Sequence, residues 1–189
     1  LKLEEGDAAF TDGERVVLPN LIARFDQLSD NFQLAKATVA LLWAQTRFGT
    51  LRVDLQALLA PHADREHVLT QFHALESLRL TARIGRELPG LYREMQRLSH
   101  ALNETLPAAW HDFAVVLAAP DASVETSLAL LDAACALPAF PSGCYHGTLR
   151  PDAVAAARAG RAEKEKARLR VKLAELLEAL PEKTAPRDT

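Results

Sequence analysis

The sequence lacks three features that would assign it quickly to a class of protein: many cysteines, a long apolar run, and a strong charge of one sign. Its two cysteines, Cys135 and Cys144, are too few for a disulfide framework. They indicate a reducing compartment, although a single bridge stays open. No apolar run approaches the roughly 20 residues of a membrane span, and Lys2 and Glu4 interrupt any signal-peptide pattern. The formal net charge of −3 gives no general case for nucleic acid or an anionic membrane. We therefore expect a cytoplasmic globular protein with no membrane partner, and its start at Leu1 rather than methionine predicts a piece of a longer chain.

Motifs of catalysis are also missing from the sequence. It contains no nucleophile elbow, no Gly-rich phosphate loop and no acid/base pair of carboxylates. None of the six histidines belongs to an HExxH motif or to a pair spaced i,i+4. Cys135, Cys144 and His146 are three soft ligands, whereas a structural zinc site closes with four, and nothing in the spacing selects His111 as the fourth. We therefore expect no enzyme activity, no bound metal and no cofactor.

Helical periodicity dominates what the chain does contain. Leucine and alanine are its commonest residues, and most glycines and prolines fall between periodic segments. This pattern is typical of an all-α fold. We expect a compact bundle of five to six helices over residues 1–151. The predicted helices lie at 30–49, 65–87, 91–103, about 105–119 and 124–137, with a short apolar segment at 53–59.

The stretch 30–49 is expected to form the central helix of this bundle. Asp30 is a candidate N-cap, and Gly49 is a natural helix stop because glycine adopts the left-handed conformation. Between them, few residues are strongly polar, and these include Gln33, Lys36, Gln45 and Arg47. A helix that is apolar on most sides belongs inside a core, so we expect the other elements to pack around it.

Residues 8–18 depart from the helical pattern. Asp12-Gly13 stands between two short apolar segments, 8–10 and 16–18. This arrangement predicts a short β-hairpin, because a type I′ turn requires positive φ at both central positions. An extended arm with a loop is the alternative. After Pro19, the segment 21–25 is expected to form one helical turn.

One pair of opposite charges lies inside the apolar stripe of the helix at 65–87, which Asp64 is expected to cap. Glu76 and Arg79 are three residues apart and therefore share a helical face. If the pair is buried, removing one partner costs about 3–5 kcal/mol, because the other charge is stranded. An exposed pair contributes well under about 1 kcal/mol. Both locations stay open, and the apolar surroundings favour the buried one.

The composition changes at residue 152, after a loop at 138–151 rich in proline and glycine. Between 158 and 172, seven basic residues accompany two acidic ones, a local excess of five positive charges. We expect a charged helix at 152–181, exposed in its middle and docked at its leucine-rich end, and a disordered tail at 182–189. Arg158, Arg161 and Lys164 are candidate contacts for an acidic protein, with a solvated face as the alternative. Aromatic residues do not interleave with the basic ones, which argues against nucleic acid as the partner.

Six short motifs occur in order between residues 16 and 151. They are Val17-Leu18-Pro19 followed by Phe25, Asp30-Asn31-Phe32 with Lys36, Phe48-Gly49-Thr50, Leu75-Glu76-x-x-Arg79-Leu80, Leu88-Pro89-Gly90-Leu91, and Tyr145-x-Gly147-x-x-x-Pro151. Their order and spacing resemble the helical region that precedes the von Willebrand factor A domain in bacterial partners of MoxR-type AAA+ ATPases, the CbbO and NorD proteins. Each motif is short, so the resemblance depends on the series. Many relatives have His-Gln-Ala in the central helix, where this chain has Leu42-Trp43-Ala44-Gln45, which is closer to the CbbO branch.

The resemblance implies structural roles for ten motif residues. These are Asn31, Phe32, Phe48, Gly49, Glu76, Arg79, Pro89, Gly90, Tyr145 and Gly147.

The resemblance also implies a non-enzymatic adaptor. In this family the ATPase is the motor, and the A domain grips the client through a metal-ion-dependent adhesion site. Neither that site's Asp-x-Ser-x-Ser motif nor a Walker sequence occurs here, so the chain corresponds to the N-terminal portion of the adaptor and is expected to help dock the ATPase. A CbbO-like protein would join a CbbQ-like ATPase in a Rubisco activase and hold Rubisco through a region absent from this chain. The alternatives are a NorD-like maturation factor for nitric oxide reductase and a stand-alone helical regulator that binds nucleic acid through the basic helix.

Overall fold

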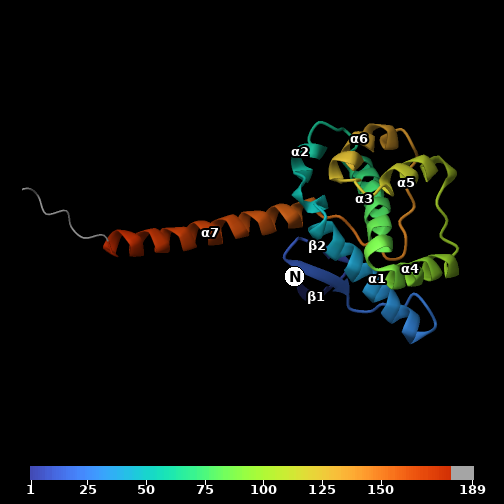
Figure 1. The fold of residues 1–189 in the computed structure, drawn as a ribbon, viewed down its shortest axis with the longest axis horizontal. Coiled ribbons are helices and arrows are strands. Elements are labelled where there is room, and N and C mark those ends of the chain that lie inside the picture. Colours follow the sequence, from blue (N-terminus) through green and yellow to red (C-terminus); the bar gives the residue numbers. More distant parts are fainter. Residues whose placement is uncertain (180–189) are drawn as a thin grey trace, which may run out of the picture.

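The computed structural model describes residues 1–179 and shows a mainly helical body from which one long helix projects (Figure 1). The strands are β1 (Lys2–Gly6), β2 (Phe10–Thr11) and β3 (Arg15–Pro19). The helices are α1 (Leu28–Arg47), α2 (Leu55–Leu59), α3 (Arg65–Glu87), α4 (Pro89–Ala101), α5 (His111–Leu117), α6 (Val124–Cys135) and α7 (Pro151–Ala179), with 3₁₀ turns at Thr50–Arg52 and Ala108–Trp110. The fold is therefore mostly helical, but the described residues hold seven helices and a small sheet rather than five to six helices alone. None of these helices combines the length and apolar character that crossing a membrane requires.

The expected hairpin is present and belongs to a three-stranded sheet in the order β1-β3-β2. Strands β2 and β3 pair antiparallel, and residues 12–14 connect them. Gly13 has a φ of 92° there but Asp12 has no positive φ, so the expected type I′ turn is wrong. The Asp12 carboxylate accepts hydrogen bonds from the backbone N–H groups of Glu14 (2.9 Å) and Arg15 (2.8 Å), which fixes that turn. Strand β1 pairs parallel with β3. The sequence did not predict this strand, because the charges of β1 conceal its alternating pattern.

Helix α3, rather than α1, is the centre of the body. It lies against α1, α4, α5 and α6, and the side chains of Phe72, Leu75 and Leu80 on it are completely buried. Helix α1 buries one face, which includes Leu41 and Ala37, and exposes the other. Phe32 is 62% exposed and Trp43 is 39% exposed. The expectation of an α1 surrounded on most sides is therefore wrong. The small number of charged residues in α1 indicated two apolar faces. It did not indicate that only one of these faces packs against other elements.

The two ends of α1 differ in how well the sequence predicted them. Gly49 has a φ of 93°, so the expected left-handed stop is confirmed. Asp30 is not the N-cap, because α1 begins two residues earlier and Gln27 occupies that position. Asp30 forms an ion pair with Arg97 of α4 at 2.8 Å instead. Residues 20–27 form a loop and not a helical turn.

Helix α7 is docked at its first turns and projects from the body beyond them (Figure 1). Val154 is buried in the core with residues of α3 and α6. Leu169, Leu173 and Leu176, by contrast, are each more than half exposed. The expected docking at the leucine-rich end is wrong over the described residues, since no described element lies beside that part of the helix. The expected tail at 182–189 lies outside the described residues.

Candidate functional site

The motif residues Glu76 and Arg79 form an ion pair buried inside the body. The exposed fractions of their side chains are 0% and 4%. Arg79 donates from Nε to Glu76 Oε1 (2.7 Å) and from Nη2 to Oε2 (2.6 Å), a two-pronged contact that aligns the planar groups. Of the buried and the exposed pair that the sequence left open, the structure therefore shows the buried one.

The Glu76–Arg79 pair connects three segments that are distant in the sequence. Ser127 of α6 donates its hydroxyl to Glu76 Oε1 at 2.6 Å, and the hydroxyl of Thr50 donates to Oε2. Arg79 Nη2 also donates to the backbone carbonyl of Phe48 at 3.1 Å. The buried carboxylate thus has four donors, which offsets the cost of removing its charge from water. The Phe48-Gly49-Thr50 motif and the Leu75–Leu80 motif meet at this network.

Two further motif residues shape loops next to α1. The side chain of Asn31 accepts from the backbone N–H groups of Arg24 (2.8 Å) and Phe25 (2.9 Å) and donates to the carbonyl of Phe25. Gly147 has a φ of 67°, and a Cβ there would lie 2.8 Å from the carbonyl oxygen of Ala9. A side chain at Gly147 would therefore push the loop away from the strands.

The remaining motif residues divide between core and surface. Tyr145 is buried against α1 and α4, and its burial raises the pKa of its hydroxyl. Pro89 and Gly90 are exposed at the start of α4, where proline suits the first helical position. Phe32 is also exposed and does not pack in the core. The motifs that carry the family resemblance therefore contain both buried and exposed residues.

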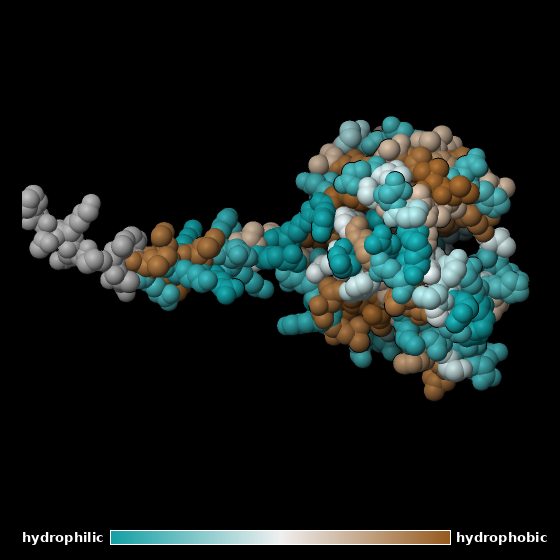
Figure 2. All heavy atoms as spheres, viewed as in Figure 1, coloured by the Kyte–Doolittle hydropathy of each residue, from teal (hydrophilic) through white to brown (hydrophobic). Residues whose placement is uncertain are grey.

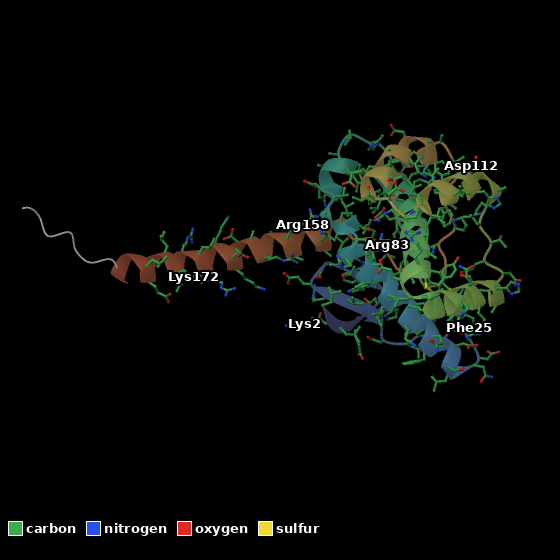
Figure 3. The ribbon with its side chains drawn as sticks, viewed as in Figure 1. Lys2, Phe25, Arg83, Asp112, Arg158 and Lys172 are labelled. Carbon is green, nitrogen blue, oxygen red and sulfur yellow. The ribbon has the colours of Figure 1, made fainter. Side chains whose placement is uncertain are left out.

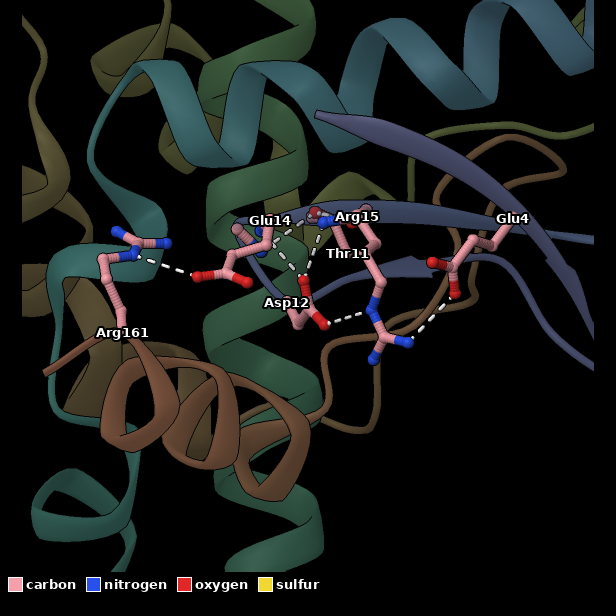
Figure 4. Close-up of polar contacts among 7 residues, drawn as sticks. Glu4, Thr11, Asp12, Glu14, Arg15 and Arg161 are labelled. Atoms are coloured by element: carbon pink, nitrogen blue, oxygen red, sulfur yellow. Dashed lines mark hydrogen bonds and ion pairs between the residues drawn. The ribbon is translucent and has the colours of Figure 1, made fainter. Parts of the chain in front are cut away.

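The root of α7 is fastened to the body by two of the three basic residues that were candidate partner contacts. Arg161 forms an ion pair with Glu14, next to the hairpin turn, at 3.2 Å (Figure 4). Arg158 donates from Nη2 to the carbonyls of Leu51 and Val53. Lys164, one turn further on, is exposed. Arg158 and Arg161 are thus engaged within the chain, whereas Lys164 makes no such contact among the described residues.

The outer part of α7 presents a mixed basic and apolar surface. Arg158 lies at the body and Lys172 far along the projecting helix (Figure 3). The side chains of Leu169, Val171, Leu173 and Leu176 are 58–65% exposed. Leu169, Leu173 and Leu176 recur at spacings of four and three, so they form one stripe along the helix. A stripe of this kind with cations around it is typical of a contact surface for another helix or protein.

Two of the histidines and both cysteines lie in buried surroundings that change their pKa values. The rings of His73 and His146 meet edge to face, with centroids 6.4 Å apart. Burial lowers the pKa of each to about 4. Burial also raises the pKa of Cys144 to about 12, which keeps its thiol protonated. Both cysteines are free, so the single bridge that the sequence left open is not formed.

A cavity of about 330 Å³, lined by both polar and apolar side chains, lies between α3, α4, α5 and the loop that precedes α7. Its lining includes the hydroxyl groups of Ser77 and Thr81, which are buried without a hydrogen-bond partner, and the side chain of Glu104. Such a lining suits water or a small polar molecule. Across residues 1–179, no three His, Cys, Asp or Glu side chains come together as metal ligands would.

Comparison with known proteins gives no match: no family model, no curated protein and no solved structure matches this chain.

Proposed function

We propose that this chain is the non-catalytic N-terminal portion of an adaptor for a MoxR-type AAA+ ATPase, in the CbbO-like branch whose client is Rubisco. The observation that supports this most is the convergence of the resembling motifs. Phe48, Thr50, Glu76 and Arg79 come from two motifs separated by about 25 residues, and they bond to one another in the interior. Residues selected from the sequence for their order therefore share one structural role, as the signature of a common fold would.

Helix α7 is the part of the chain best suited to contact the ATPase. Its root is fixed by Arg158 and Arg161, so the body holds the helix in one direction. Its outer part offers exposed leucines and several cations to a partner. A partner with an acidic rim around an apolar groove would match this surface. The adaptor would then join the ATPase through α7 while the region absent from this chain holds the client.

A pull-down with a CbbQ-like ATPase tests this proposal. We expect the chain to retain the ATPase, with or without nucleotide, and the double variant Leu169→Glu/Leu173→Glu to lose it. Val115→Glu is the matched control, because Val115 is an exposed apolar residue on α5 and is 74% exposed. A chain that is folded by circular dichroism but binds no MoxR-type ATPase would contradict the proposal. The same assay with a NorD-associated ATPase and nitric oxide reductase distinguishes the NorD-like alternative.

The exposed cations of α7 favour nucleic acid as the second candidate partner. Arg168, Arg170 and Lys172 are exposed and have few acidic neighbours. A gel shift at low salt that disappears when these three are changed to glutamine would support this alternative, since phosphate contacts weaken with salt. No shift at low salt would remove it. Arg158 is a poor choice for this test, because its substitution would also loosen the root of α7.

A further inference from the structure

An apolar groove opens between the N-terminal sheet and helix α1. Its volume is about 670 Å³. On one side lie Leu1, Leu3, Val16 and Leu18, which share a face of the sheet because alternate residues of a strand point the same way. On the other side lie Phe32, Ala35, Val39 and Trp43 of α1, and Leu88 and Leu91 line it as well. Figure 2 shows apolar side chains gathered on the body below the root of α7, in this region.

Three apolar side chains of this groove are more than half exposed. Leu3 is 67% exposed, Phe32 is 62% exposed and Leu1 is 56% exposed. Isolated apolar residues are common on protein surfaces, but a contiguous set that lines a hollow marks a place where a partner binds. From Phe32 to Trp43, α1 borders the groove over roughly 16 Å at about 1.5 Å per residue, which matches about three turns of a helix laid beside it.

The charge of the groove indicates what kind of helix fits. Among the described residues that line it, the charged ones are Lys2 and Lys36, both basic. The ammonium of Lys36 lies 5.7 Å from the centre of the Phe32 ring, so it sits at the apolar surface. Acidic side chains on the flanks of an incoming helix would meet both lysines favourably.

The same charges disfavour a second copy of the chain as the occupant. The apolar stripe of α7 would bring Arg168, Arg170 and Lys172 towards Lys2 and Lys36. Like charges across an interface oppose binding.

We propose that this groove is a docking site for an amphipathic helix of a partner protein, with apolar residues spaced i, i+3/i+4, i+7 and acidic residues on its flanks. The apolar face would fill the space between Leu3 and Phe32, and the acidic flanks would face Lys2 and Lys36. The groove is distinct from the outer part of α7, so a failed ATPase pull-down would leave this proposal standing.

Fluorescence anisotropy with two labelled peptides tests it. The acidic probe is a peptide of about 14 residues, roughly four helical turns, with leucines at the stated spacing and glutamates elsewhere. The basic probe has lysines in place of the glutamates. We expect the full chain to bind the acidic probe at least about tenfold more tightly than the basic one. Exchange of Lys2 and Lys36 for glutamate should reverse this preference.

Variants of exposed residues then locate the binding. Phe32→Glu should weaken binding of the acidic probe by about tenfold or more, because a large apolar anchor is lost. Val115→Glu, on α5 and outside the groove, should leave it unchanged. An acidic probe with a central proline, which cannot continue a helix, should also bind poorly.

Four outcomes would overturn the proposal: no binding of either probe, equal binding of both, an unaffected Phe32→Glu variant, or equal binding of the proline probe. Sedimentation of the unmodified chain gives a further check. A dimer that Phe32→Glu converts to a monomer would assign the groove to a second copy and not to an acidic helix.

Discussion

The carboxylate of Glu76 and the guanidinium of Arg79 face each other in the interior of the body, three residues apart on α3, and both are closed off from solvent. A buried ion pair stabilises a fold only when other groups complete its hydrogen bonds, because both charges have left water. Here Ser127, Thr50 and the carbonyl of Phe48 complete them. The pair therefore holds α6 and the end of α1 against α3.

Removal of either charge should leave the other stranded. Glu76→Ala and Arg79→Ala should each lower the free energy of unfolding by about 3–5 kcal/mol. The double variant should lose much less than the sum of the two, because it strands no charge. Urea denaturation of all four proteins measures this coupling. Additive losses would show that the two side chains do not depend on each other.

Gly49 should tolerate no side chain, because its φ of 93° is a conformation that other residues rarely adopt. Gly49→Val should lower the free energy of unfolding by about 1–2 kcal/mol or more. Gly90→Ala is the matched control, since a Cβ there meets nothing within 4 Å and its φ is not in the left-handed range. Thermal unfolding should show a lower midpoint for the first variant and no loss for the second. An unchanged midpoint for Gly49→Val would contradict the conformation at this position.

The two arginines at the root of α7 should contribute unequally. Arg158 is partly buried and donates hydrogen bonds to the backbone carbonyls of Leu51 and Val53. Without Arg158, these carbonyls would have no donor in its place. Arg161 and Glu14 are 57% and 37% exposed, and such pairs contribute less than about 1 kcal/mol. Arg158→Ala should speed hydrogen exchange in the first turns of α7 by about tenfold or more, whereas Arg161→Ala should change it little. Equal effects of the two variants would show that the surface ion pair matters as much as the buried contact.

Acid should weaken the fold through His73 and His146. Burial lowers the pKa of each from 6.5 to about 4, so the unfolded chain binds protons at these sites between those pH values and the folded chain does not. Their contribution to stability is therefore complete above about pH 6.5 and falls as the pH drops towards 4. Between pH 6.5 and 4, the free energy of unfolding should fall less for His146→Gln than for the unmodified chain. Urea denaturation at each pH measures this free energy. His100→Gln, which changes an exposed residue of α4, is the control. A pH profile that His146→Gln leaves unaltered would show that this histidine charges as freely in the folded chain.

Helix boundaries with strong local signals could be predicted from the sequence. The predicted helix at 65–87 agrees with α3, because Asp64 caps it and Leu88-Pro89 ends it. The stop at Gly49 depends on a backbone conformation that glycine favours, and Asp12-Gly13 marks the place of a turn, although not the expected type I′ turn.

Features that depend on distant neighbours could not be predicted. Strand β1 exists because β3 provides a partner for its backbone. The exposed face of α1 and the projecting end of α7 have apolar patterns that look like those of buried helices. Periodicity shows which face of a helix is apolar, but it does not show whether anything covers that face. The docking of Arg158 on the carbonyls of Leu51 and Val53 has no sequence signal, because any exposed arginine on a helix would look the same.

The attachment of α7 gives this rod a mechanical property. From Arg161 to Ala179 the helix extends roughly 27 Å, at about 1.5 Å per residue, beyond its last contact with the body. A load applied at the far end acts on the root with that whole length as its lever arm, and Glu14 and the segment before α2 receive it. A sideways force at the far end would therefore be delivered to the hairpin turn that holds Glu14 and to the short connection between α1 and α2.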